Sequence, residues 1–254
     1  MSWIPASLIS KSTGLRSALR RAGVTKHLSV LRPFLSGANY EERVDQALQS
    51  MLREGDVVWD VGANVGLYTE RFAQAVGPSG AVVAFEPIAT TFEALRSRVE
   101  AIPNVAIRMQ ALGSKLGSVE VTLDADPTSA TNTLAQSASS GASTQTVSLT
   151  TMDDVLENEG LACPNVVKID TEGFEEEVIW GMRRALGNPA LRAIMIEMHF
   201  ALLEGQGYRR APDRICSALL DRGFELTWVD PSHLLARREG SKAGVSARTG
   251  SPGA

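Results

Sequence analysis

The stretch that decides the fold is Val57–Thr69, which reads VVWDVGANVGLYT. It begins with an apolar run that ends in Asp60, continues through a turn with Gly62 and Gly66, and enters a segment that is typical of a helix. Glycines in such a turn accept backbone angles that other residues avoid, and the helix that follows presents free N–H groups at its start. The pattern therefore predicts a strand, a tight turn and a helix that form one end of a ligand site.

The glycine spacing differs from that of a dinucleotide-binding turn. That turn has three glycines in the pattern G-x-G-x-x-G, whereas the turn here reads D-x-G-x-N-x-G, with Asp60 first and Asn64 inside it. The Asp60 carboxylate would repel a pyrophosphate and suits a ligand with a positive charge, such as the amino group of S-adenosylmethionine (SAM). For this motif alone, an ordinary turn with a structural aspartate remains the alternative.

A second acid follows the next apolar run. Residues 81–85 read AVVAF and are followed by Glu86 and Pro87. Nucleotide-binding α/β folds place a carboxylate about 20 residues after the glycine turn, where it accepts hydrogen bonds from ribose hydroxyls. The two motifs together are more specific than either alone, and they predict that Glu86 holds the ribose of SAM.

Three segments in this order resemble one known family. They are Asp60–Gly66 (DVGANVG), Phe85–Pro87 (FEP) and Val167–Glu175 (VKIDTEGFE). Together they resemble the FkbM-type methyltransferases, a family of SAM-dependent O-methyltransferases, and the third segment is the most specific to that family. A NAD-type dehydrogenase on the same layout is disfavoured by the missing third glycine and by Asp60.

The resemblance implies a fold, an activity and a set of SAM contacts. The fold is a Rossmann-like class I methyltransferase fold, an α/β architecture with a doubly wound, mostly parallel sheet of seven strands. The expected reaction is methyl transfer to a hydroxyl of a sugar-containing small molecule or glycan. A polyketide, a peptide or another non-sugar acceptor, and a non-catalytic SAM-binding protein, remain alternatives. The residues expected to bind SAM are Asp60, Gly62, Asn64, Gly66, Tyr68, Glu86, Pro87, Ala111 and Leu112.

The chain is expected to comprise an N-terminal helical cap (1–39), the methyltransferase domain (40–238) and a disordered tail (239–254). Alternating residues 119–123 and 146–149 predict a β-hairpin inserted into the domain. The loop at residues 129–134 either folds over cofactor or substrate or is an ordinary surface loop. Ala111 and Leu112 are expected at the end of the third strand, and one helix is expected to run from Phe174 to Leu186.

Several acids follow the core strands at the edge where open α/β sheets bind ligands. Methyl transfer to a hydroxyl needs a group that removes its proton or a metal that activates it. His199 is the first candidate for the base, because its unperturbed pKa lies near working pH, and Asp170 and Glu172 are candidates beside it. Asp170 and Glu197 are oxygen ligands of the kind that Mg²⁺ prefers, so they are the predicted metal ligands.

Composition limits the classes of partner. The chain has 254 residues, 44% of them apolar, and a net charge of −4, which disfavours nucleic acid as the main partner. Two cysteines without metal or redox spacing favour a reducing cytoplasm. No apolar run approaches the roughly 20 residues of a membrane span.

The N-terminal segment stands apart in charge, because residues 1–40 contain six basic side chains and no acid. A helical cap over the site, a surface that meets anionic lipid and an organellar transit peptide all fit this composition. We favour the cap, since charge runs are usually solvated faces of helices. Dimerisation through these helices is a further hypothesis.

Overall fold

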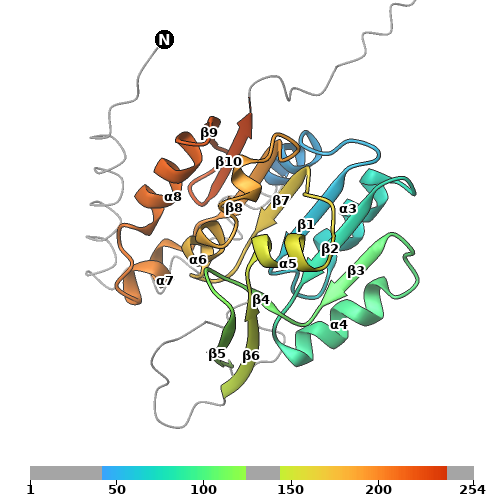
Figure 1. Cartoon of the computed structure of the whole chain (residues 1–254), viewed down its shortest axis with the longest axis horizontal. Helices are drawn as coiled ribbons and strands as arrows, with labels where there is room; N and C mark the ends of the chain where they lie inside the picture. The colour runs from blue at the N-terminus through green and yellow to red at the C-terminus, as the bar shows by residue number, and fades with distance from the viewer. Residues whose placement is uncertain (1–41, 124–143, 239–254) are drawn as a thin grey trace, which may run out of the picture. The chain divides into compact units, whose positions relative to one another are not determined.

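The computed structural model of the chain describes residues 42–123 and 144–238 (Figure 1). The predicted N-terminal cap, the loop at residues 129–134 and the predicted tail lie outside these residues, and so does the segment of the dimerisation hypothesis. The chain divides into two compact units, residues 1–45 and residues 46–254. Everything that follows concerns the second unit, apart from a helix over residues 42–49 that begins in the first.

Seven strands form the main sheet in the order β3-β2-β1-β7-β8-β10-β9. Every neighbouring pair is parallel except those that involve β10, which runs antiparallel to β8 and β9. This topology confirms the predicted Rossmann-like class I methyltransferase fold, and it brings the carboxyl ends of β1, β2, β7 and β8 to one edge. The strands are β1 (Val57–Val61), β2 (Ala81–Phe85), β3 (Val105–Arg108), β7 (Val166–Ile169), β8 (Ala193–Glu197), β9 (Phe224–Trp228) and β10 (His233–Arg238).

Both faces of this sheet are covered, which is why its strands read as apolar runs. Alternate residues of a strand point to opposite faces. Val83 and Phe85 belong to the largest apolar cluster, with side chains of α5, α6 and α8, whereas Ala84 belongs to a separate cluster with α4. The helices are α3 (Leu67–Val76), α4 (Ala89–Val99), α5 (Met152–Asn158), α6 (Glu175–Trp180), α7 (Phe200–Gly205) and α8 (Ala211–Leu220).

None of the helices in residues 42–123 and 144–238 combines the length and apolar character needed to cross a membrane.

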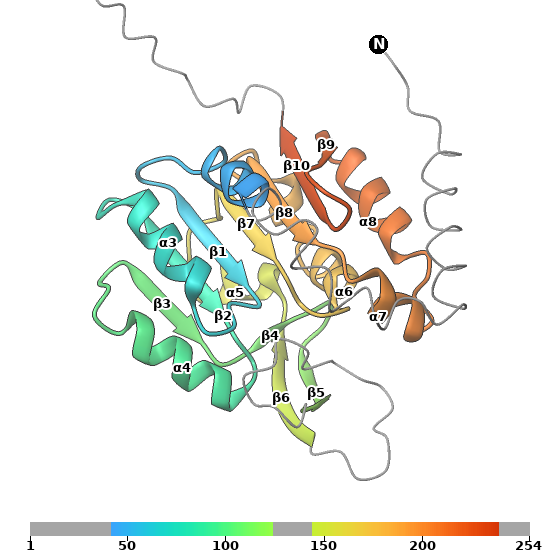
Figure 2. The ribbon, with the colours of Figure 1, turned by 180° about the vertical axis from the view of Figure 1, so that it is seen from behind.

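A second, three-stranded sheet confirms the predicted hairpin insertion. Strands β5 (Gly117–Thr122) and β6 (Thr144–Thr150) pair antiparallel, with Val119 opposite Val147. Figures 1 and 2 show this small sheet projecting from the main sheet. Its third strand is β4 (Ala111–Leu112), which pairs in parallel with β6. The placement of these two residues at the end of the third main-sheet strand was therefore wrong, because the chain leaves β3 at Arg108 and joins the inserted sheet.

The helix after β7 is shorter than predicted. α6 ends at Trp180, and a 3₁₀ turn, η1 (Ala185–Gly187), replaces its expected last part. Beyond Trp180 the amides of Arg184 and Ala185 donate to the Asp153 carboxylate instead of to helical carbonyl oxygens. Gly181 also approaches another segment so closely that a side chain there would place its first carbon 1.8 Å from the carbonyl oxygen of Gly113. Helical spacing in the sequence could not reveal this contact, because Gly113 belongs to a distant part of the chain.

Candidate active site

A pocket of about 260 Å³ lies at the carboxyl ends of the parallel strands. It collects ten of the residues predicted for cofactor, catalysis or metal, which come from strand β4, from the end of β8 and from the segments that follow β1, β2, β7 and β8. They are Gly62, Asn64, Glu86, Pro87, Ala111, Leu112, Asp170, Glu172, Glu197 and His199.

A larger pocket of about 380 Å³ lies between α6 and α8, and it contains none of these residues. Its lining includes Arg183, Arg210, Arg214 and Arg222, together with Trp180. We assign the chemistry to the smaller pocket, because the residues suited to binding SAM and handling a proton meet there.

The glycine turn forms one wall of the smaller pocket. Gly62 has a φ of 80°, and a side chain there would place its first carbon 1.8 Å from the carbonyl oxygen of Asp170. The amides of Gly62 and Ala63 both donate to the carbonyl oxygen of Phe85, at 3.0 Å. Only glycine therefore fits at this position, where its amide joins the end of β1 to β2 and its backbone lies against the carbonyl group of Asp170 after β7.

Gly66 has a different role from the one predicted. It precedes α3 with a φ of 83°, and a side chain there would approach Leu95 of α4 to 2.7 Å. Gly66 does not line the pocket. Its conformation and its packing against α4 explain the glycine, so the predicted SAM contact is not supported at this position.

Asp60 is also removed from the pocket. It lies within β1, opposite Lys168 of β7, and it is fully buried. Its Oδ2 accepts a hydrogen bond from the hydroxyl of Thr69 at 2.6 Å, and its Oδ1 lies 3.9 Å from Lys168 Nζ. Burial raises the pKa of Asp60, and the charge of Lys168 opposes that rise. The cation that faces Asp60 in this structure is therefore Lys168 of the protein itself, and the direct contact of Asp60 with SAM stays a prediction.

Lys168 lies between this buried acid and Asp170, which follows β7. Its Nζ lies 3.0 Å from Asp170 Oδ2 and 4.9 Å from the centre of the Tyr68 ring. Tyr68 therefore contacts the buried ammonium group and is not among the residues that line the pocket, so its contact with SAM stays a prediction. Burial lowers the pKa of Lys168, but Asp170 and Asp60 outweigh it and raise the pKa, so the amine stays protonated.

Glu86 stands where a ribose carboxylate is expected. Its two oxygens accept hydrogen bonds from the amides of Asn64 and Ile88, each at 2.9 Å, and its side chain lines the pocket. Burial raises its pKa to about 7, although both amides favour the charged form and lower the pKa. The two amides thus fix the position of the carboxylate, but burial still destabilises its charged form. Hydrogen bonds from the hydroxyl groups of a ligand would stabilise that form.

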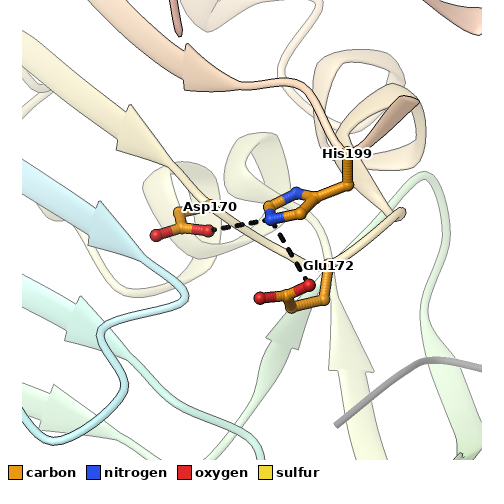
Figure 3. Close-up of side chains that lie close together, drawn as sticks. All are labelled: Asp170, Glu172 and His199. Carbon is orange, nitrogen blue, oxygen red and sulfur yellow. Dashed lines mark ion pairs between the residues drawn. The ribbon is translucent and has the colours of Figure 1, made fainter. Parts of the chain in front are cut away.

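His199 lies between two acids at the other side of the pocket, as Figure 3 shows. Its Nε2 is 3.3 Å from Glu172 Oε2 and 3.7 Å from Asp170 Oδ1. On the far side of the ring, Nδ1 lies 2.8 Å from Glu175 Oε1. Burial lowers the pKa of His199, but Glu172 and Glu175 outweigh burial and raise it to about 11. The carboxylates around the ring favour its protonated form, and the role of His199 as the base stays a prediction.

Glu197 does not join this group. Its carboxylate lines the pocket but lies 3.4 Å from His233 Nε2. Within the described residues, the three side chains that present possible metal-ligand atoms within 4.8 Å of one another are Asp170, Glu172 and His199. Glu197 therefore does not lie in the group whose atoms could hold an ion together with Asp170, and its role as a metal ligand stays a prediction.

Two functional contacts were missed by sequence reasoning. Glu175 is not among the predicted site residues, yet it is fully buried and contacts His199. Gln145 of β6 accepts a hydrogen bond from the amide of Ala89 and donates one to the carbonyl oxygen of Pro87. It thereby attaches the inserted hairpin to the segment after Glu86. A single lysine, Lys168, in an otherwise apolar strand indicates a buried ion pair. The sequence does not indicate which acids pair with it.

Comparison with known proteins agrees with this geometry. Residues 60–226 match the Methyltransferase FkbM domain. The chain belongs to the FkbM methyltransferase family. The matched region contains the glycine turn, Glu86, the Asp170–Glu175 segment and His199.

Two relatives have assigned names. The chain is 31% identical over 159 residues to the hexuronic acid methyltransferase AglP of Haloferax volcanii, in a match that covers 63% of this chain and 62% of AglP. It is 30% identical over 196 residues to the 31-O-demethyl-FK506 methyltransferase FkbM of Streptomyces tacrolimicus, covering 62% of this chain and 74% of that protein. The chain thus spans less than two thirds of the length of the first relative.

Among solved structures, the precorrin-6Y C5,15-methyltransferase of Geobacter metallireducens aligns with a TM-score of 0.48 and 16% identity, covering 78% of this chain and 88% of that one.

Proposed function

We propose that this protein is a SAM-dependent O-methyltransferase that acts on a hydroxyl of a sugar-containing small molecule or glycan. The observation that carries the proposal is that a single pocket holds both a site suited to SAM and a cluster of proton-handling side chains. Family membership supports the same reaction class.

The cofactor side of the pocket is formed by the ends of β1 and β2 and by the inserted sheet. We assign the ribose hydroxyls to Glu86, because its carboxylate is anchored by two amides and still faces the pocket. The backbone of Gly62 and Asn64 lines the wall beside it. We assign the adenine to the apolar surface of Ile88, Leu112 and Val121, next to Ala111 and Pro87. Asp60, Gly66 and Tyr68 support this wall from behind.

The acceptor side is formed by Asp170, Glu172 and His199. Methyl transfer is an in-line displacement, in which the acceptor oxygen forms a bond to the methyl carbon while the carbon–sulfur bond breaks and the hydroxyl proton leaves. The carboxylates of Asp170 and Glu172 offer acceptors for that proton within the pocket. Holding the two reactants aligned in one enclosed site can supply several kcal/mol of the barrier reduction.

The sugar acceptor is supported by the likeness to AglP, whose name gives a hexuronic acid as its substrate. The likeness to the 31-O-demethyl-FK506 methyltransferase supports a non-sugar acceptor as the second candidate. We place the protein in the cytoplasm, since both cysteines are free thiols, as a reducing compartment favours.

The test begins with calorimetric titration of S-adenosylhomocysteine into the purified full chain, with NAD⁺ as the control ligand. We expect binding of the first and none of the second. Glu86→Ala should weaken binding about 10-fold to 100-fold, since hydrogen bonds to a charged group contribute about 1.5–3 kcal/mol. Glu93→Ala is the matched control, because Glu93 is exposed on α4 and pairs with Arg96.

Transfer of labelled methyl from SAM to hexuronic acids, neutral glycosides and macrocyclic alcohols then separates the two acceptor classes. Failure to bind S-adenosylhomocysteine would overturn the cofactor assignment. Turnover of macrocyclic alcohols alone would overturn the sugar assignment and leave the methyltransferase assignment standing.

A further inference from the structure

Three side chains from two neighbouring strand ends converge on one point of the pocket. Asp170 and Glu172 follow β7, and His199 follows β8. Their ligand atoms all lie within 4.8 Å of one another, and Figure 3 shows the same ring nitrogen of His199 facing both carboxylates. An imidazole nitrogen and two carboxylate oxygens at this separation can surround a single cation.

The orientation of His199 is fixed from behind by Glu175. The Glu175 side chain is fully buried, and its Oε1 accepts hydrogen bonds from His199 Nδ1 at 2.8 Å and from the amide of Gly173 at 2.9 Å. This leaves Nε2 as the nitrogen that faces the pocket. A carboxylate behind a ligating histidine is the usual outer-shell arrangement of metal sites, where it fixes the ring and raises its basicity.

The backbone holds Glu172 in place at an energetic cost. Its φ is 51°, and among the described residues only Asn64, which also lines the pocket, shares a positive φ without being glycine. Such strain costs about 1–3 kcal/mol and persists at binding and catalytic sites, where the surrounding structure enforces it. Here the strained turn is what places the Glu172 carboxylate beside His199 Nε2.

The balance of charges around Asp170, Glu172 and His199 favours a bound cation. Lys168 lies against Asp170 Oδ2, on the side away from His199, and also near Asp60. Within residues 42–123 and 144–238, the cationic side chain that pairs with both Glu172 and Glu175 is His199. A divalent ion at Nε2 would offset both carboxylates more fully than a single proton does.

We propose that Asp170, Glu172 and His199 bind one divalent transition-metal ion of the Mn²⁺ type, with Glu175 as the positioning residue behind His199. The mixed nitrogen and oxygen donor set suits such an ion better than Mg²⁺ or Ca²⁺, which prefer oxygen ligands alone. Asp170, Glu172 and His199 all line the pocket, so an ion between them would border it. Resting on the proposed function, such an ion would supply a Lewis acid that lowers the pKa of the acceptor hydroxyl, and a carboxylate oxygen of the cluster that does not ligate the ion would take the proton.

The test uses electron paramagnetic resonance to follow the binding of Mn²⁺ to the full chain after treatment with a chelator. We expect one Mn²⁺ per chain. Glu172→Gln and His199→Gln should each weaken binding by at least about 10-fold, and Glu175→Gln should weaken it by about 10-fold to 100-fold through the orientation of His199.

Glu197→Gln is the matched control, because it removes the same charge from the same pocket outside the proposed ligand set. It should leave Mn²⁺ binding unchanged within about twofold. S-adenosylhomocysteine binding, measured in parallel on every variant, shows that each one is folded and tests the proposed function separately.

A wild-type chain that binds S-adenosylhomocysteine but no Mn²⁺ would overturn the metal site and leave the proposed function intact. Mn²⁺ binding that survives His199→Gln unchanged, or that falls as far in Glu197→Gln as in Glu172→Gln, would also overturn it.

Discussion

The protonation of Glu86 should control how tightly the cofactor binds. Burial raises the pKa of Glu86 to about 7 in the free protein. Glu86 accepts hydrogen bonds from ribose hydroxyls in its carboxylate form. In protein molecules whose Glu86 is protonated, binding of the ligand must therefore release that proton. The ionised fraction at that pKa is about one in eleven at pH 6 and about ten in eleven at pH 8. The affinity for S-adenosylhomocysteine should therefore rise about 10-fold between pH 6 and pH 8.

Isothermal titration calorimetry measures this directly. At pH 7, repeating the titration in buffers of different ionisation enthalpy should show about half a proton released per ligand bound. Glu86→Gln keeps the shape of the side chain but cannot ionise, so its affinity should be lower and should not follow this pH profile. A wild-type affinity that is flat between pH 6 and pH 8, or a pH dependence that persists in Glu86→Gln, would refute the reasoning.

The raised pKa of Glu86 should also make the free energy of unfolding fall as the pH rises. The folded pKa of Glu86 lies above its ordinary value of 4.5, so the unfolded chain loses this proton first as the pH rises. Glu86 therefore favours folding less and less between about pH 4.5 and pH 7, by about 3 kcal/mol in total. Urea unfolding of the ligand-free protein should show this decline, and Glu86→Gln should reduce it.

Two further substitutions test the wall of the pocket and the buried charges behind it. Gly62→Ala should abolish S-adenosylhomocysteine binding, because the added carbon would lie 1.8 Å from the Asp170 carbonyl oxygen. Gly223→Ala is the control, because Gly223 has a similar φ of 79° and an added carbon there would meet no atom within 4 Å. This variant should be only mildly destabilised and should keep binding. Equal loss of binding in both variants would contradict the role of that close contact. Lys168→Met should lower the free energy of unfolding by about 3–5 kcal/mol, since it leaves Asp60 buried without its cation. Adding Asp60→Asn should recover part of that loss in urea unfolding, and full additivity of the two substitutions would refute the pairing.

Local sequence patterns determined the fold class and most of the pocket wall. Continuous apolar runs, each followed by glycine or an acid, predict buried strands with a ligand at their carboxyl ends, and the family resemblance of their motifs implies the parallel sheet. For the same reason Gly62, Glu86 and Asp170 could be placed at one edge before their neighbours were known. Each of these residues directly follows an apolar run, so it lies at the carboxyl end of that strand whichever strands are its neighbours.

The tertiary structure alone decided which side chains meet. The partner of Asp60 is Lys168, set by the register of β1 against β7. The partner of His199 is Glu175, because the start of α6 lies beside the segment that follows β8. Sequence order brings neither pair together. The same holds for Glu197, which pairs with His233 only because β10 runs antiparallel beside β8. Charge and hydrogen-bond energies depend on distances of a few ångströms, and these distances are fixed only when strands that are far apart in sequence are aligned side by side.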